Sequence, residues 1–254
     1  MRLKIIFSTI FFLLFSNIVF AEISQGFEIV KKSFDMWRGE NSSIATFTMA
    51  VIRPDRTTTM TLKFWSKGDD YSIGKFQAPP RYKGQAILVD HDSMWTYSAK
   101  SNRSIKIANS LKSQAWMGSD MSYDDISVTI DMLNNYTYKM LPSEHKNGEE
   151  IYVIEATPFK NAPIVWGKEV YKIKKSDNSL VSKDFYDQSG KAVKRFLALK
   201  VGYYKGNKAK PIMEHMRVFN LEKEGYYTDF IMKDVTLDVA IDSKIFSLSN
   251  LSKP

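Results

Sequence analysis

The side chains that could do chemistry in this chain are few and scattered. The three histidines are His91, His145 and His215. They form no His-Glu-x-x-His motif and share no other metal-ligand spacing. His145 falls in a polar stretch, residues 143–150, that reads as a loop, and His215 falls in an alternating, strand-like stretch. We expect a surface or sheet-packing role for each histidine, and therefore no metal site.

Paired carboxylates are the other candidates for catalysis. They occur at Asp69-Asp70, Asp124-Asp125 and Glu149-Glu150. Neighbouring residues of a strand point to opposite faces, so such pairs rarely act together. Asp124 and Asp125 fall at an expected helix start, where the helix dipole favours negative charge. The sequence has no Gly-x-Ser-x-Gly elbow, phosphate loop or dinucleotide glycine pattern. With no cysteine there is also no thiol nucleophile or disulfide. We expect a protein that is not an enzyme and has no cofactor.

Residues 1–21 have the layout of a cleaved secretory signal. Arg2 and Lys4 are followed by an apolar run from Ile5 to Phe20, and Ala21 ends the stretch. The run is about 16 residues, short of the roughly 20 that span a bilayer. An uncleaved anchor is the alternative interpretation. Residue 22 is Glu22 and not cysteine, so no lipid anchor is expected. We expect a soluble periplasmic product, a single domain of residues 22–254.

The charge of the chain bears on its partners. The formal net charge is +8, and the two basic residues of the expected signal leave +6. Lys205, Lys208 and Lys210 form a basic loop, which is either a solvated surface or weakly attractive to anionic lipid headgroups. Nucleic acid is not an expected partner behind an export signal. Twelve methionines and 13% aromatic residues supply large, adaptable apolar side chains, which hints at a hydrophobic cavity.

Alternation of apolar and polar residues predicts about twelve or thirteen strands separated by turn signals. They fall at residues 45–51, 59–64, from 71, 85–90, 94–98, 103–108, 136–141, 151–157, 169–175, 180–187, 193–203, 212–220 and 227–235. So many strands in one chain indicate a mainly β protein with one large curved antiparallel sheet. We expect an incomplete β-barrel, a half-barrel, because the apolar face of such a sheet must be covered.

Two helices are available as that cover. Residues 23–37 place Ile23, Phe27, Val30, Phe34 and Trp37 on one stripe, and Gly39 is a plausible stop. A second helix is expected at residues 123–133. A capping box made by Ser122 and Asp125 precedes it. Two helices cannot cover so wide a sheet completely. We therefore predict a hydrophobic cavity between the sheet and the helices.

The candidate residues of that cavity come from the apolar phase of the strands and of the second helix. They are Phe47, Met49, Met60, Leu62, Phe64, Trp95, Tyr97, Ile126 and Ile130. Ordinary core packing is the alternative for each of them.

One stretch has a distinctive pattern of residues. It runs through Tyr82-Lys83-Gly84-Gln85-Ala86-Ile87-Leu88, Met94-Trp95-Thr96-Tyr97, Arg103-Ser104-Ile105-Lys106-Ile107 and Trp116-Met117-Gly118-Ser119-Asp120-Met121-Ser122-Tyr123-Asp124-Asp125-Ile126. The sequence resembles the outer-membrane lipoprotein-sorting family, the LolA-like proteins, and its branch associated with resistance-nodulation-division type exporters. The resemblance is most specific from Gly118 to Ile126. Within this segment, Gly118, Ser119, Asp120 and Tyr123 are expected to shape the turn into the lid helix, or to contact a partner.

The resemblance implies a half-barrel whose cavity carries the acyl chains of lipoproteins or other lipids. It implies an inner-membrane exporter as donor and an outer-membrane acceptor. The family's ligand-gating arginine has no assigned position here, so the cargo stays open. Two alternatives remain: a periplasmic sensor or adaptor of the same fold that binds lipoproteins and regulates a membrane partner, and an exported hydrolase.

Overall fold

A computed structural model describes residues 25–35, 41–127, 133–207 and 210–253. Within them, thirteen strands form one open antiparallel sheet. The strands are β1 (Ser42–Arg53), β2 (Arg56–Lys67), β3 (Tyr71–Ala78), β4 (Ala86–Asp90), β5 (Ser93–Ser98), β6 (Arg103–Lys106), β7 (Tyr136–Lys146), β8 (Glu149–Pro158), β9 (Lys168–Lys174), β10 (Leu180–Tyr186), β11 (Ala192–Tyr203), β12 (Pro211–Asn220) and β13 (Tyr227–Leu237). The predicted fold class is confirmed.

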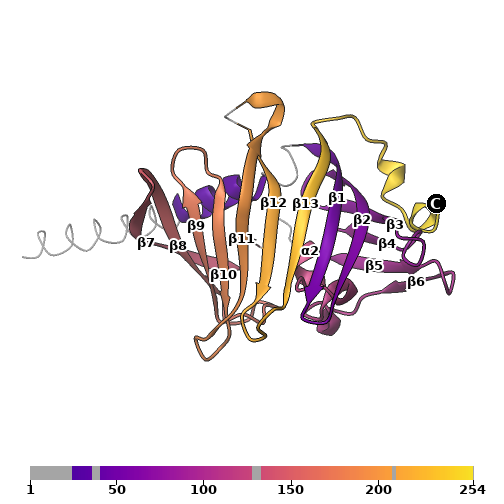
Figure 1. Cartoon of the computed structure of the whole chain (residues 1–254), viewed down its shortest axis with the longest axis horizontal. Coiled ribbons are helices and arrows are strands. Elements are labelled where there is room, and N and C mark those ends of the chain that lie inside the picture. Colours follow the sequence, from indigo (N-terminus) through magenta and orange to yellow (C-terminus); the bar gives the residue numbers. More distant parts are fainter. Residues whose placement is uncertain (1–24, 36–40, 128–132, 208–209, 254) are drawn as a thin grey trace, which may run out of the picture.

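The chain enters this sheet at its centre. The strand order is β6-β5-β4-β3-β2-β1-β13-β12-β11-β10-β9-β8-β7, so β1 pairs with β13 although the two lie at opposite ends of the sequence (Figure 1). The chain runs outward from β1 to β6, crosses to the far edge at β7 and returns. The described parts of that crossover, residues 107–127 and 133–135, lie over one face of the sheet. They hold the short helices η2 (Asn109–Leu111), η3 (Trp116–Gly118) and α2 (Tyr123–Ile126).

A helix of residues 25–34 covers the other half of the same face, which we call the concave face. Ile29 and Val30 are buried in a core cluster with Tyr138 of β7 and Ile154 of β8. The Phe27 ring meets the Tyr138 ring edge-on at 5.7 Å. The predicted stripe is confirmed here, while Ile23, Trp37 and Gly39 lie outside the described residues.

The second predicted helix, residues 123–133, is helical at both of its described ends but is interrupted after Ile126. Its capping box is confirmed, because Ser122 and Asp125 bond each other reciprocally. Helical geometry then ends at Ile126, and Ser127 (φ −94°, ψ 10°) caps the turn. Residues 128–132, including Ile130, lie outside the described part.

The predicted loop at 143–150 is wrong. β7 continues to Lys146, and His145 pairs with Glu150 across a tight hairpin. Asn147 and Gly148 both have positive φ, as two-residue hairpin turns of this kind require. The polar side chains of this stretch face solvent from a strand edge and not from a loop.

The convex face of β2 to β5 carries a core of its own, which the sequence did not reveal. Phe246 and Leu251 pack on Ile73 and Leu88. They come from the C-terminal segment, which forms η5 (Ser243–Ile245) and α4 (Leu248–Leu251) and lies beside β3 and β4 (Figure 1). Among the described residues, no helix has the length and apolarity needed to cross a bilayer.

Candidate ligand pocket between sheet and helices

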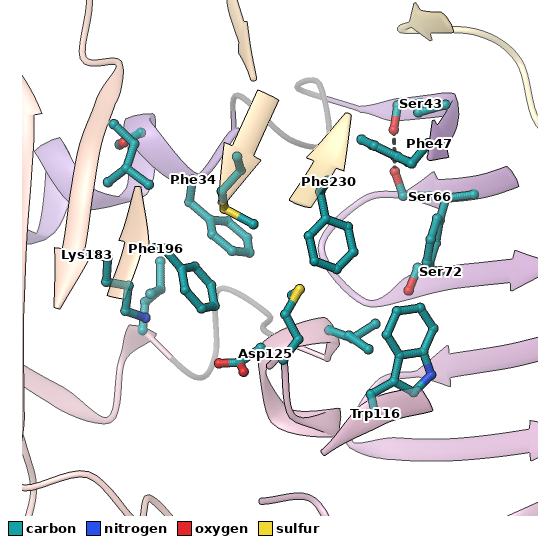
Figure 2. A pocket seen from close by; sticks show the side chains of 18 of the residues that line it. Phe34, Ser43, Phe47, Ser66, Ser72, Trp116, Asp125, Lys183, Phe196 and Phe230 are labelled. Atoms are coloured by element: carbon teal, nitrogen blue, oxygen red, sulfur yellow. Dashed lines mark hydrogen bonds between the residues drawn. The ribbon is translucent and has the colours of Figure 1, made fainter. Parts of the chain in front are cut away.

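A pocket separates two core clusters on the concave face. It holds about 1280 Å³ of space between protein atoms, counting its mouth, which is open to solvent. Part of this space is open solvent at the mouth, so a ligand can fill only a fraction of it. Its walls come from the helix of residues 25–34, from the crossover, and from strands on both sides of the β1–β13 pair (Figure 2).

The walls are rich in aromatic side chains. Phe47 of β1, Phe64 of β2 and Trp116 of η3 form a run of rings, with centroids 6.1 and 6.5 Å apart. Phe230 and Phe196 face them from β13 and β11, and Phe34 closes the wall from the helix (Figure 2). The ring of Phe64 lies over Gly74, its partner on β3, where a Cβ atom would meet the ring.

The structure divides the predicted cavity residues into three groups. Phe47, Phe64 and Ile126 line the pocket. Met49, Met60 and Leu62 share its face of the sheet but are fully buried in the adjoining core cluster, so they are packing residues beside the pocket. Trp95 and Tyr97 lie on the opposite face of the sheet.

Trp95 and Tyr97 project from the convex face of β5. They pack against the cluster around Phe246 and Leu251. On the concave side, β5 contributes Met94, which is fully buried. Alternate residues of a strand face opposite sides of the sheet, and either set can be buried. Trp95 and Tyr97 were expected to face the pocket because they are aromatic, but the C-terminal segment covers them on the convex face.

The Gly118–Asp120 turn ties the crossover to the centre of the sheet. Met117 and Gly118 adopt positive φ (51° and 72°), which turns the chain after Trp116. Arg53, the last residue of β1, donates to the Gly118 carbonyl at 2.6 Å and to Asp120 Oδ2 at 2.9 Å. Thr228 of β13 also donates to Asp120 Oδ2, at 2.7 Å.

The remaining motif residues support the same turn. The Ser119 hydroxyl donates to the Trp116 carbonyl at 2.7 Å. Tyr123 packs against the core beside Trp116, and burial raises the pKa of its hydroxyl. The motif thus has the geometry of the predicted turn into α2.

Two charged residues, Asp125 and Lys183, line one side of the pocket, and each is paired with a buried partner; sequence reasoning missed this charged wall. Glu169 of β9 is almost fully buried. It accepts hydrogen bonds from Tyr136 (3.0 Å) and Tyr171 (2.6 Å), and the Lys183 ammonium of β10 lies 2.8 Å away. Burial, and then the Glu169 charge, raise the pKa of both tyrosines far above the ordinary value. Lys183 and Tyr171 line the pocket itself.

A second buried ion pair adjoins the first. The Lys194 ammonium of β11 lies 2.9 and 2.7 Å from the two carboxylate oxygens of Asp125, and Asp125 lines the pocket. Both ammonium groups lie over the Phe185 ring, Lys183 at 4.4 Å and Lys194 at 4.1 Å from its centroid. Burial lowers the pKa of Lys194, and the pair with Asp125 opposes that shift.

The sequence did carry a signal for this wall. Glu169 alternates in phase with Tyr171 and Ile173, and Lys194 alternates with Phe196. A charged residue in the apolar phase of a strand is buried and needs a partner. No group of three or more metal-ligating side chains occurs among the described residues.

Comparisons with known proteins agree with this architecture. The chain resembles a domain from Vibrio parahaemolyticus whose name places it among outer membrane lipoprotein-sorting proteins, at 23% identity and a TM-score of 0.79 over 91% of this chain and 100% of that one. A DUF1329 family protein from Desulfovibrio piger matches at 24% identity and a TM-score of 0.81, over 91% and 99%. A LolA superfamily protein from Nitrosomonas europaea matches at 20% identity and a TM-score of 0.73, over 88% and 98%.

These likenesses identify the fold. No curated protein matches the chain in sequence. A family model described as "Uncharacterized protein" matches residues 68–253, which is most of the chain. The chain therefore belongs to that family, and its fold is the LolA-like fold of outer-membrane lipoprotein-sorting domains.

Proposed function

We propose that this protein binds acyl chains of lipoproteins or other lipids in the pocket and carries them between the inner and outer membranes without catalysis. The single observation that carries the proposal is a mainly apolar pocket, rich in aromatic side chains, between sheet and helices. The LolA-like fold and the lipoprotein-sorting name of the Vibrio parahaemolyticus domain support it.

The physical need for such a pocket is large. Moving an acyl chain from a bilayer into water costs roughly 0.8 kcal/mol of free energy per CH2 group. A chain of about fourteen carbons therefore costs on the order of 10 kcal/mol. Rings from Phe47, Phe64, Phe230 and Trp116 offset that cost by burial alone, so no reaction is required.

The proposal includes a route. Residues 1–21, outside the described part, direct export and are removed, and residues 22–254 act in the periplasm as one domain without a lipid anchor. An inner-membrane exporter delivers the cargo, and an outer-membrane acceptor takes it. Release follows when the acceptor binds the acyl chains more tightly.

Uptake of a fluorescent fatty acid by the purified protein, together with native mass spectrometry, tests acyl binding. We expect saturable uptake and a co-purified acyl-bearing molecule. Ala45→Trp fills the pocket from β1 and should abolish uptake. Ala50→Trp, on the same strand but in the opposite alternation phase, is the matched control. Wild-type protein without ligand or uptake contradicts the proposal.

A further inference from the structure

The charged wall of the pocket has its acceptors satisfied. Asp125 accepts from Lys194 and from the backbone N–H and hydroxyl of Ser122, at 2.7 to 2.9 Å. Glu169 accepts from Tyr136 and Tyr171 and is paired with Lys183. A bound molecule that offers only donors would therefore find these carboxylates already occupied.

Donors, by contrast, remain on this side of the pocket. An ammonium group has three N–H donors. Among the described residues, Glu169 is the one ion-pair partner of Lys183, whose side chain is only 13% exposed and lines the pocket. Figure 2 shows Lys183 on the same side of the pocket as Phe196 and Asp125. The same ammonium lies over the rings of Tyr171 and Phe185, 4.9 and 4.4 Å from their centroids, so a charged acceptor that enters the pocket would exchange ring contacts for a charge-assisted hydrogen bond.

A second donor lies on the helix of residues 25–34. Ser33 lines the pocket and is 4% exposed. Its hydroxyl has no hydrogen-bond partner within the part of the chain that the structure describes. A buried hydroxyl that faces a cavity without a partner is the kind of group that a ligand satisfies.

We propose that the pocket holds an amphiphile with a carboxylate head group, with Lys183 as the main head-group contact and Ser33 as a further donor. This inference rests on the proposed function and specifies its ligand. One ammonium and one hydroxyl match a singly charged carboxylate better than a phosphate, which would bring more negative charge beside Asp125 and Glu169. The ammonium of Lys194 lies over the same Phe185 ring as Lys183, but Asp125 balances its charge, so Lys183 is the head-group contact.

The tail then has one direction to take. From Lys183, the pocket continues between Phe196 and Phe34 toward Phe230 and Trp116 (Figure 2). Beyond these rings it reaches Ser43 and Ser66, whose hydroxyls bond each other at 2.8 Å. The aromatic stretch suits a hydrocarbon chain, and the mutually bonded serines do not compete for the head group.

Displacement of a fluorescent fatty acid by palmitic acid, cetyl alcohol and methyl palmitate tests this inference. Wild-type protein should prefer the acid to the alcohol by about tenfold, the worth of one charge-assisted hydrogen bond. Ser33→Ala should weaken palmitate binding about twofold, a fraction of one neutral hydrogen bond. Because the Ser33 hydroxyl has no partner, this change should leave the fold intact.

Variants of Lys183 separate the head-group contact from folding. Lys183→Met alone leaves Glu169 buried without its cation, so Lys183→Met/Glu169→Gln removes both charges together. The double variant should bind acid and alcohol equally while its alcohol affinity stays within about twofold of wild type. Lys168→Met, which breaks a more exposed pair with Glu155, is the matched control and should behave as wild type.

The outcomes are distinguishable. If wild-type protein binds acid, alcohol and ester equally and the double variant changes nothing, the head-group assignment is wrong and acyl binding stands. Tighter binding of methyl palmitate than of palmitic acid would likewise show that the head-group assignment is wrong and that acyl binding stands. If wild-type protein binds none of the three, the proposed function fails and this inference fails with it.

Discussion

Lys194 of β11 and Asp125 of α2 join the crossover to the sheet through a buried ion pair, 2.9 and 2.7 Å between the ammonium and the two carboxylate oxygens. Their side chains are 8% and 5% exposed. Asp125 also completes the capping box with Ser122. One carboxylate therefore both starts α2 and holds it over the pocket.

Lys194→Met should destabilise the protein by roughly 3–5 kcal/mol, because it leaves the Asp125 carboxylate buried without a cation. Lys194→Met/Asp125→Asn should recover most of that loss. Lys191→Met, which breaks the exposed pair with Glu222, should cost less than about 1 kcal/mol. Urea unfolding measures all three. Equal losses for Lys194→Met and Lys191→Met would show that the buried pair has no special part in the fold.

Arg53 should hold the Gly118–Asp120 turn against the sheet. Arg53→Lys keeps the charge but cannot reach the Gly118 carbonyl and the Asp120 carboxylate with one planar fork. We expect a loss of about 1.5–3 kcal/mol, typical of hydrogen bonds to charged groups, and faster hydrogen exchange in residues 116–126. Arg56→Lys, in an exposed pair with Asp55, is the control. Unchanged exchange in the crossover would contradict this role.

Gly74→Ala should alter the pocket from beneath. The added Cβ meets the Phe64 ring, which must swing toward the pocket. We expect a stability loss of about 1–3 kcal/mol, as for overpacking, and weaker acyl binding. In a Phe64→Ala background the added Cβ meets no ring. The double variant Phe64→Ala/Gly74→Ala should therefore be as stable as Phe64→Ala alone. If Gly74→Ala binds acyl ligands as wild type does, Phe64 does not shape the site.

Alkaline pH should unfold the protein through buried tyrosines. Burial, followed by the charge of Glu169, raises the pKa of Tyr136, Tyr138 and Tyr171 above the ordinary 10.0. Their folded pKa values exceed the unfolded ones, so their stabilising contribution is complete below pH 10 and is lost as pH rises above it. Tyrosinate absorbance should show three tyrosines that ionise only as the chain unfolds. Their ionisation in the folded protein would contradict the assigned burial.

Most of the fold was predictable because alternation and turn chemistry are local. The strands fell within a few residues of their observed bounds, and the capping box at Ser122 marked the start of α2. The end of α2 was not predictable, because apolar spacing continues past Ile126 and the cap at Ser127 has no strong signal. The placement of Trp95 depended on a distant C-terminal segment.

The pocket was predictable in kind but only partly in its residues. Phe47, Phe64 and Ile126 line it, whereas Met49, Met60 and Leu62 fill the neighbouring core. The alternation of a strand shows which residues share a face, but not where along the strand the packing opens. The charged wall is made by Asp125, Lys183 and their partners Lys194 and Glu169. These residues are far apart in the sequence and meet only in the folded sheet.

The most direct test is a crystal structure of the protein with a fatty acid brominated along its tail. The account predicts an anomalous bromine signal among Phe47, Phe64 and Phe230, with the tail between sheet and helices. A pocket filled by the protein's own side chains, with bromine bound only on the outer surface, would contradict it.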